Sequence, residues 1–239
     1  MRTRTSERQA GSRRWGAASS RQRKWRAAQR SGGFAAPRLR RIEGRLLGEH
    51  YWLGAGDECW FLREYVPGAG YGHGSTNDLI SNLKKPRGAS PAKLGHKARA
   101  IRQVAGELAA ALAGPRWRGW VLAPMPPSVV PWEDGYDERM EEVCRRVGRA
   151  TGLEVRELLV ANETVQGVSR GGRRRSPAEL ADWIDVDEDV VPPWPERVLV
   201  VDDVVTSGAH FVAARRALEG RFPGVRVAGV FVARVVHDA

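Results

Sequence analysis

The sequence predicts an α/β fold in which a parallel sheet is flanked by helices, and the C-terminal third carries the evidence. Residues 198–201 are four consecutive Val or Leu residues, which is typical of a strand buried on both faces. An Ala-rich segment over about 208–220 has the character of a helix that lies close to a sheet, and residues 225–233 form a second apolar strand. Strand, helix and strand in this order predict a right-handed parallel crossover.

The preceding residues alternate between strand and helix patterns in the same way. Ile101, Val104 and Leu108 recur at helical spacing, and Ser176 followed by Pro177 and Glu179 is a capping box that starts a helix. We expect strands at residues 59–65, 120–123 and 154–160, and helices at about 75–83, 97–113 and 136–150. This order extends the α/β pattern upstream.

The positive charge of the chain is concentrated in its first 45 residues. They hold 13 Arg and one Lys against two Glu, a net charge of +12, so the other residues are near neutral at −1 within a total of +11. Rich in Arg, Ser, Gly and Ala, residues 1–45 are expected to form a disordered arm, and residues 46–239 a single domain. The arm could contact nucleic acid weakly, be a solvated tail, or reflect an over-extended start of translation.

Two other features bear on the cellular setting. No apolar run is long enough to span a membrane, and the Arg-rich start lacks the apolar stretch of an export signal, so we expect a cytoplasmic protein without membrane contact. Cys59 and Cys144 form neither a disulfide framework nor a metal cluster, and Cys144 lies on a helical apolar stripe as a core residue.

The segment that carries chemistry is residues 198–210, Val-Leu-Val-Val-Asp-Asp-Val-Val-Thr-Ser-Gly-Ala-His. Ligands of an open parallel sheet bind beyond the carboxyl ends of its strands, and here Asp202 and Asp203 are expected to emerge there. The turn that follows has small residues and hydroxyls and leads into a helix N-terminus, which suits an anion.

Acceptors beside an anion cradle fit a ligand with vicinal hydroxyls and a phosphate. We therefore expect a ribose 5-phosphate group, with Asp202 and Asp203 accepting from its hydroxyls. Its phosphate would be bound by five consecutive residues, Thr206, Ser207, Gly208, Ala209 and His210. If both aspartates were buried in ion pairs, or if the turn faced away from an open cleft, this interpretation would fail.

Two other protein classes place paired acidic residues after an apolar strand. A receiver domain needs its acidic pair near the start of the domain and a Lys on a later strand, whereas residues 225–233 contain no Lys. A Walker-type magnesium site needs a Gly-x-x-x-x-Gly-Lys-[Ser/Thr] loop, which this chain lacks. Neither class accounts for the Thr-Ser-Gly turn.

Residues 198–208 resemble the motif by which type I phosphoribosyltransferases bind phosphoribosyl pyrophosphate (PRPP), and the chain is most similar to ComF-like and amidophosphoribosyltransferase-like members. Residues 79–85 are similar to the Leu-Ile-x-x-Leu-Lys stretch of ComF-like proteins, and residues 123–128 stand where that family has Pro-Val-Pro. Residues 164–166 and 173–176 are similar to its Thr-x-x-Gln and downstream Arg. The family's Arg-Gly-Phe-Asn-Gln is absent, and residues 134–139 take its place.

The resemblance implies a glycosyltransferase of nucleotide metabolism. It would transfer phosphoribose from PRPP to a nitrogen acceptor of unknown identity, releasing pyrophosphate, with Mg²⁺ held mainly through PRPP, and it could dimerise as family members often do. Asp202 and Asp203 would be the catalytic pair, and the pyrophosphate would contact Met125 and Pro126 together with Arg173, Arg174 and Arg175. The alternative is a non-catalytic protein that senses PRPP or a nucleotide, linked to DNA uptake or processing.

Overall fold

The computed structural model describes residues 38–163 and 176–236, which belong to one compact unit, Ala36–Ala239. Its helices are α2 (Ser75–Leu83), α3 (Pro91–Leu112), α4 (Arg139–Thr151), α5 (Pro177–Ala181) and α6 (Ala209–Arg221). Its strands are β1 (Arg40–Arg41), β2 (Glu58–Tyr65), β3 (Val121–Pro124), β4 (Glu154–Val155), β5 (Leu159–Ala161), β6 (Ile184–Val186), β7 (Arg197–Val205) and β8 (Arg226–Val235).

Six strands form the main sheet in the order β1-β2-β8-β7-β3-β4. Only β1 pairs antiparallel, with β2, and the other neighbours are parallel. From β3 the chain crosses through α4 to β4 on one side, whereas from β7 it crosses through α6 to β8 on the other. The strand order therefore reverses between β3 and β7, and such a reversal opens a crevice at the carboxyl ends of the two strands.

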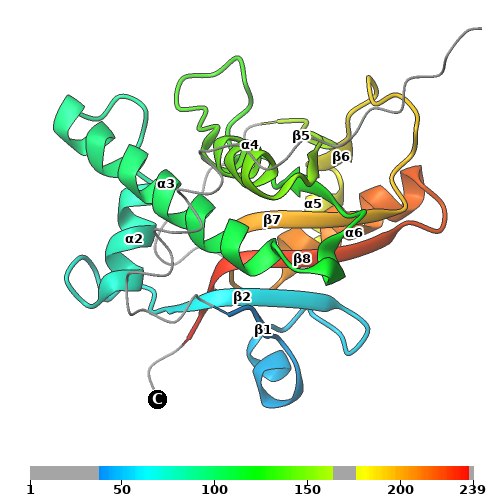
Figure 1. Ribbon diagram of the computed structural model, residues 1–239, viewed down its shortest axis with the longest axis horizontal. Coiled ribbons are helices and arrows are strands. Elements are labelled where there is room, and N and C mark those ends of the chain that lie inside the picture. The colour runs from blue at the N-terminus through cyan, green and yellow to red at the C-terminus, as the bar shows by residue number, and fades with distance from the viewer. Residues whose placement is uncertain (1–37, 164–175, 237–239) are drawn as a thin grey trace, which may run out of the picture. The chain divides into compact units, whose positions relative to one another are not determined.

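Helices cover both faces of this sheet, as Figure 1 shows. On one face α2 contacts β2 and α4 contacts β3 and β7, with α3 packed against both helices. On the other face α6 contacts β7 and β8. Residues 198–201 of β7 are 1% exposed or less, as expected for a strand covered on both sides. The fold class predicted from the sequence, α/β with a mostly parallel sheet, is confirmed.

Most of the expected elements are present, but the strand predicted at residues 154–160 is wrong. The structure divides it between two sheets, because β4 pairs with β3 while β5 pairs antiparallel with β6. Between them, Arg156 donates to the carbonyl oxygens of Val191 and Pro193, at 2.6 and 2.7 Å, and Leu158 is fully buried. The predicted helix at 97–113 also begins earlier, at Pro91.

The folded unit begins before Leu46, the boundary predicted from composition. Arg40 and Arg41 pair with β2, and Ile42 is 1% exposed. The guanidinium of Arg40 lies 4.4 Å from the centre of the Phe61 ring, a cation–π contact. Local composition missed this edge strand because its partner is distant in sequence. The rest of the predicted arm, residues 1–37, lies outside the described residues.

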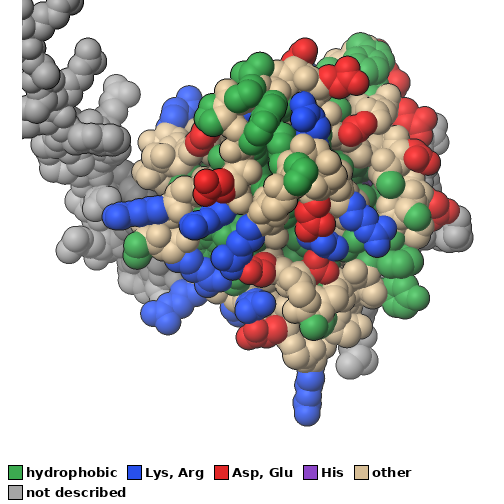
Figure 2. All heavy atoms as spheres, turned by 90° about the vertical axis from the view of Figure 1, so that its right-hand side faces the viewer, with side chains coloured by type: hydrophobic (Ala, Val, Ile, Leu, Met, Phe, Trp, Pro, Cys, Tyr) green, Lys and Arg blue, Asp and Glu red, His purple; other side chains and the backbone are tan. Residues whose placement is uncertain are grey.

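Two further observations concern the described part of the chain. Cys59 and Cys144 are both buried and unpaired, which confirms the core position of Cys144. None of the described helices has the combination of length and apolar character that crossing a bilayer requires. Figure 2 shows one end of the molecule, where acidic and basic side chains are interspersed with hydrophobic ones.

Candidate functional site

Asp202 and Asp203 lie on β7 at the crevice between β3 and β7. The last paired residues of these strands are Pro124 and Val201, and the N–H of Met125 donates to the carbonyl oxygen of Val201 at 2.9 Å. Beyond this point β3 no longer accompanies β7. The expectation that Asp202 and Asp203 emerge beyond the end of this strand is wrong, however, because β7 continues to pair with β8 as far as Val205.

The two carboxylates point to opposite faces of the sheet, since successive side chains of a strand alternate. Asp203 lies on the face of α2 and α4, where it contacts Lys84 and Arg139. Asp202 lies on the face of α6, where it borders a small hollow together with Thr206, Gly208 and His210. The pair therefore does not form one carboxylate surface, and the two aspartates must have different roles.

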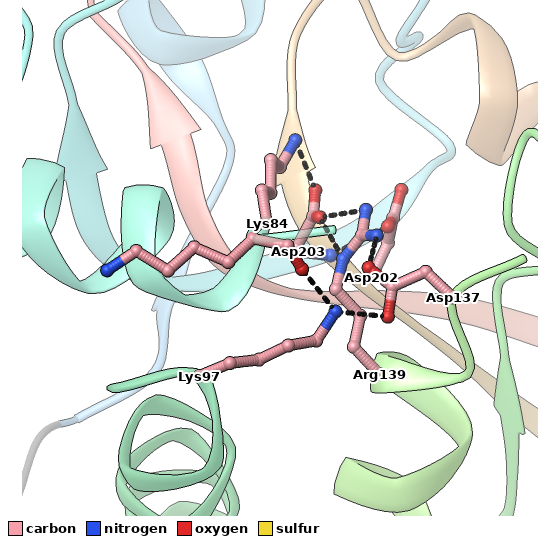
Figure 3. A network of polar contacts seen from close by, with 7 residues as sticks. Lys84, Lys97, Asp137, Arg139, Asp202 and Asp203 are labelled. Carbon is pink, nitrogen blue, oxygen red and sulfur yellow. Dashed lines mark hydrogen bonds and ion pairs between the residues drawn. The ribbon is translucent and has the colours of Figure 1, made fainter. Parts of the chain in front are cut away.

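Both carboxylate oxygens of Asp203 are engaged in a network of ion pairs (Figure 3). Oδ1 lies 3.0 Å from Lys84 Nζ, and Oδ2 accepts from Nε and Nη2 of Arg139 at 3.0 and 2.7 Å. Arg139 also donates to Asp137 at 2.7 Å, and Asp137 accepts from Lys97 at 2.6 Å. Three cations from α3, α4 and the end of α2 thus surround two carboxylates.

This network keeps Asp203 ionised. Burial raises the pKa of its carboxyl, but Lys84 and Arg139 outweigh that effect and hold the pKa below its usual value. For Arg139, burial lowers the pKa of the guanidinium, but the carboxylates of Asp203 and Asp137 raise it by a larger amount. Asp203 is therefore buried in ion pairs, which the sequence interpretation named as adverse, and it does not present a free carboxylate to a sugar.

Asp202 is in a different electrostatic state. It is half-buried, and its Oδ1 accepts the N–H of Asp203 at 2.7 Å. Burial, and after it the neighbouring charge of Asp203, raise the pKa of its carboxyl to about 7. A strongly perturbed carboxyl in a crevice is a common property of functional sites. Of the two aspartates, Asp202 is the one able to meet a ligand.

The Thr206–Gly208 turn is held by a segment from the other end of the chain. His50 Nδ1 contacts the carbonyl oxygen of Thr206, and the N–H of Trp52 donates to that of Ser207 at 2.8 Å. Gly208 has a φ of +87°, and a Cβ there would lie 2.6 Å from Leu53. The next residue, Ala209, begins α6, whose first-turn N–H groups have no acceptor within the helix and favour an anion.

The hollow that this turn borders is narrow. Its volume is about 10 Å³, close to the space that one water requires. A ligand larger than water would therefore lie at its mouth, beside Asp202 and the turn, and not within it. His210 is exposed at this mouth, with its ring packed edge-on against Trp183 at 5.4 Å between centres.

A larger cavity, of about 450 Å³, lies at the end of β3. Its lining comes from residues 124–127, from the loop that leads to α4, from β5 and from the residues beside it. Met125, which is buried, and Pro126 border it as part of the turn expected to contact pyrophosphate. The other residues of that expectation, Arg173, Arg174 and Arg175, lie outside the described residues.

Sequence reasoning missed most of the charged network. The sequence patterns do not indicate that Lys84, Lys97, Asp137 and Arg139 belong to one network. These four residues come from three segments, and no spacing within any one of them indicates a common partner. Only the packing of α2, α3 and α4 on one face brings them to Asp203.

The site offers limited ligands for a metal ion. No group of three or more His, Cys, Asp or Glu residues able to hold a metal occurs within residues 38–163 and 176–236. Mg²⁺ commonly binds through one or two carboxylates together with phosphates and water, and the half-buried carboxylate of Asp202 fits that pattern.

The chain was also compared with known proteins. No protein-family model matches it, and no curated protein is similar to it.

Proposed function

We propose that this protein binds PRPP with Mg²⁺ and transfers the phosphoribosyl group to a nitrogen acceptor, with release of pyrophosphate. The observation that supports this most is the position of Asp202 and the Thr206–Ala209 turn at the crevice between β3 and β7. Open α/β sheets bind their ligands at such a reversal of strand order. The proposal also rests on the resemblance of residues 198–208 to the PRPP-binding motif.

In this proposal each end of the phosphoribosyl group has its own partner. The 5-phosphate is bound by backbone N–H groups at the start of α6, where the helix dipole favours negative charge. The turn is held for this task by His50 and Trp52, which contact its carbonyl oxygens. Asp202 accepts hydrogen bonds from the ribose hydroxyls at the mouth of the hollow.

Asp203 acts through its cations. It holds Lys84 and Arg139 at the carboxyl end of β7, and Asp137 holds Arg139 from the other side. A pyrophosphate with several negative charges is attracted to this pair of cations, because Arg and Lys both suit phosphate oxygens. Lys84 is the more accessible, with 45% of its side chain exposed against 20% for Arg139.

The transfer makes one bond at C1 of the ribose and breaks another. The acceptor nitrogen supplies its lone pair to C1, pyrophosphate leaves with the electron pair of the C1–O bond, and the proton lost by the nitrogen passes to solvent. The sugar develops positive charge as in glycoside cleavage, and the ionised Asp202 carboxylate stabilises it. Bound Mg²⁺ would neutralise the pyrophosphate, with Asp202 as a ligand directly or through water.

A second candidate function is a protein that binds PRPP or a nucleotide without turnover. The observation that favours it is the mutual neutralisation of Asp203, Lys84 and Arg139. Cations already paired with a buried carboxylate offer less attraction to a leaving group than free ones. Fold alone does not decide between transfer and sensing.

The test is pyrophosphate release from PRPP and Mg²⁺ in the presence of a panel of nucleobases. Release that requires a base, and that is lost in Asp202→Asn, supports transfer. Asp185→Asn is a matched control, because Asp185 also lies on a strand and accepts the N–H of the next residue at 2.7 Å. Binding of PRPP without release supports the sensor, and no binding of PRPP contradicts both functions.

A further inference from the structure

The cavity at the end of β3 has the properties of a small-molecule site. Its volume, about 450 Å³, lies within the range of about 300–1,000 Å³ that such sites occupy. Prolines of the 124–127 turn and the rings of Trp132 and Tyr136 form much of its wall. Trp132 is 75% exposed, so its ring face is available to a planar ligand at the rim.

The charged groups of this cavity have one sign. Glu141, Glu157 and Asp187 line it, and none of its described lining residues is Lys or Arg. Arg145 approaches Glu141 at 3.0 Å and Glu157 at 3.6 Å, but is not itself part of the lining. Glu141 is fully engaged, because its other oxygen accepts from the Tyr136 hydroxyl.

Glu157 and Asp187 are the carboxylates best able to meet a ligand. The side chain of Glu157 is 56% exposed, and among the described residues Arg145 is the one cation that lies close to it. Asn162, whose amide nitrogen donates to the carbonyl of Asp182, adds a side-chain oxygen as a further acceptor in the lining. A cavity with an excess of acceptors and negative charge favours a ligand that donates N–H groups, and the same cavity repels phosphates.

We infer that this cavity binds a planar nitrogen heterocycle carrying an exocyclic amino group, as the acceptor of the proposed transfer. As an acceptor site it rests on the proposed function, while as a binding site it rests on the cavity alone. The cavity adjoins the sugar site, because Met125 on its wall donates to Val201, the residue before Asp202. Neighbouring strands lie about 5 Å apart, which places the acceptor within reach of a ribose held at Asp202.

This inference divides the ligands between two regions of opposite charge. The pyrophosphate goes to the cations Lys84 and Arg139, and the acceptor goes to the acidic cavity. The acidic lining argues against the sequence-based expectation that Met125 and Pro126 face the pyrophosphate. The three carboxylates in the wall would repel that group, whereas Glu157 and Asp187 would accept hydrogen bonds from an amino group.

The experiment is calorimetric titration of the full chain with two matched pairs of bases, without PRPP. Adenine is compared with hypoxanthine, and cytosine with uracil, since each pair exchanges an amino group for a carbonyl oxygen. We expect the amino member of at least one pair to bind about tenfold more tightly, the effect of a hydrogen bond to a charged group. In Glu157→Gln this preference should fall below about threefold.

Two further variants separate recognition from folding. Trp132→Ala should weaken both members of the preferred pair equally, because stacking does not depend on the exchanged group. Glu154→Gln is the matched control, because Glu154 is an exposed glutamate on β4 with 61% of its side chain accessible. This substitution should leave binding of the bases unchanged.

Equal binding of amino and oxo bases, or an undiminished preference in Glu157→Gln, would overturn the inference. Absence of binding by all four bases in a chain that still binds PRPP would also overturn it and leave the proposed function standing. If the amino bases bind as expected and PRPP does not, the cavity is an amino-heterocycle site and the proposed function fails.

Discussion

Replacing Asp202 by Asn should raise the free energy of unfolding of the protein and weaken its binding of PRPP. In the folded state burial and the charge of Asp203 raise the pKa of Asp202 from 3.8 to about 7. At alkaline pH the ionised carboxylate therefore costs folding free energy, whereas Asn carries no charge. Its side-chain oxygen can still accept the N–H of Asp203, so the local hydrogen bond is kept.

The magnitude follows from the shift in pKa. A change of about three units corresponds to roughly 4 kcal/mol as an upper bound. Because Asp202 is only half-buried and solvent can relax around it, we expect about half of this, ~2 kcal/mol. For a domain of this size that gain raises the melting temperature by roughly 4–8 °C.

The pH dependence has a definite sign. A carboxyl whose pKa is raised on folding contributes no penalty below its unfolded pKa of 3.8, and the penalty grows until pH passes about 7. The advantage of Asp202→Asn should therefore be small near pH 4, increase up to pH 7 and remain constant above it.

Thermal unfolding followed by circular dichroism at pH 5 and pH 8 provides the assay. Wild type, Asp202→Asn and the control Asp185→Asn are compared without ligand. The difference in melting temperature between the control and wild type should be about the same at both pH values. A lower melting temperature for Asp202→Asn at pH 8, or a gain that is the same at both pH values, would refute the electrostatic reasoning.

Four other predictions concern the same site. Asp203→Asn should lower the free energy of unfolding by about 3 kcal/mol, because it leaves the buried charge of Arg139 with Asp137 as its remaining carboxylate. Urea denaturation measures this, and an unchanged midpoint would contradict the network. The stability that Asp203 gives should also be lost on acidification below its unfolded pKa, since its folded pKa is lowered, and the loss should be absent in Asp203→Asn. Gly208→Ala should lower the free energy of unfolding by about 2 kcal/mol, because the φ of +87° and the closeness of Leu53 both disfavour a Cβ. It should also weaken PRPP binding measured by calorimetry, and unaltered binding would show that the turn does not contact the ligand. Transfer activity with saturating Mg²⁺ should rise with pH as Asp202 ionises and should vanish with a chelator, and activity that survives metal removal would contradict the proposed role of Mg²⁺.

The elements that could be predicted from sequence are those whose periodicity is continuous. The apolar run of β7, the spacing of α3 and the capping box at Ser176 are local signals, and the last is present with both of its hydrogen bonds. β1 is two residues long and exists because β2 lies beside it. The division of residues 154–160 between two sheets is equally nonlocal, because it depends on contacts of Arg156 with residues 191 and 193.

The candidate site was located from sequence, but its internal arrangement was not. The motif at residues 198–210 led to the crevice between β3 and β7, because strand ends of a parallel sheet are where ligands bind. It did not indicate that β7 extends to Val205, which turns Asp202 and Asp203 to opposite faces. That extension depends on the length of β8, and the charges around Asp203 depend on helix packing.

The central claim is that Asp202 and the adjoining turn bind the phosphoribosyl group of PRPP. Calorimetric titration with PRPP and Mg²⁺ measures this directly in wild type, Asp202→Asn and Asp185→Asn. We predict saturable binding to wild type and to Asp185→Asn, and at least a tenfold loss of affinity in Asp202→Asn, as expected for a charge-assisted hydrogen bond. Equal affinity of all three proteins would place the ligand elsewhere and contradict the claim.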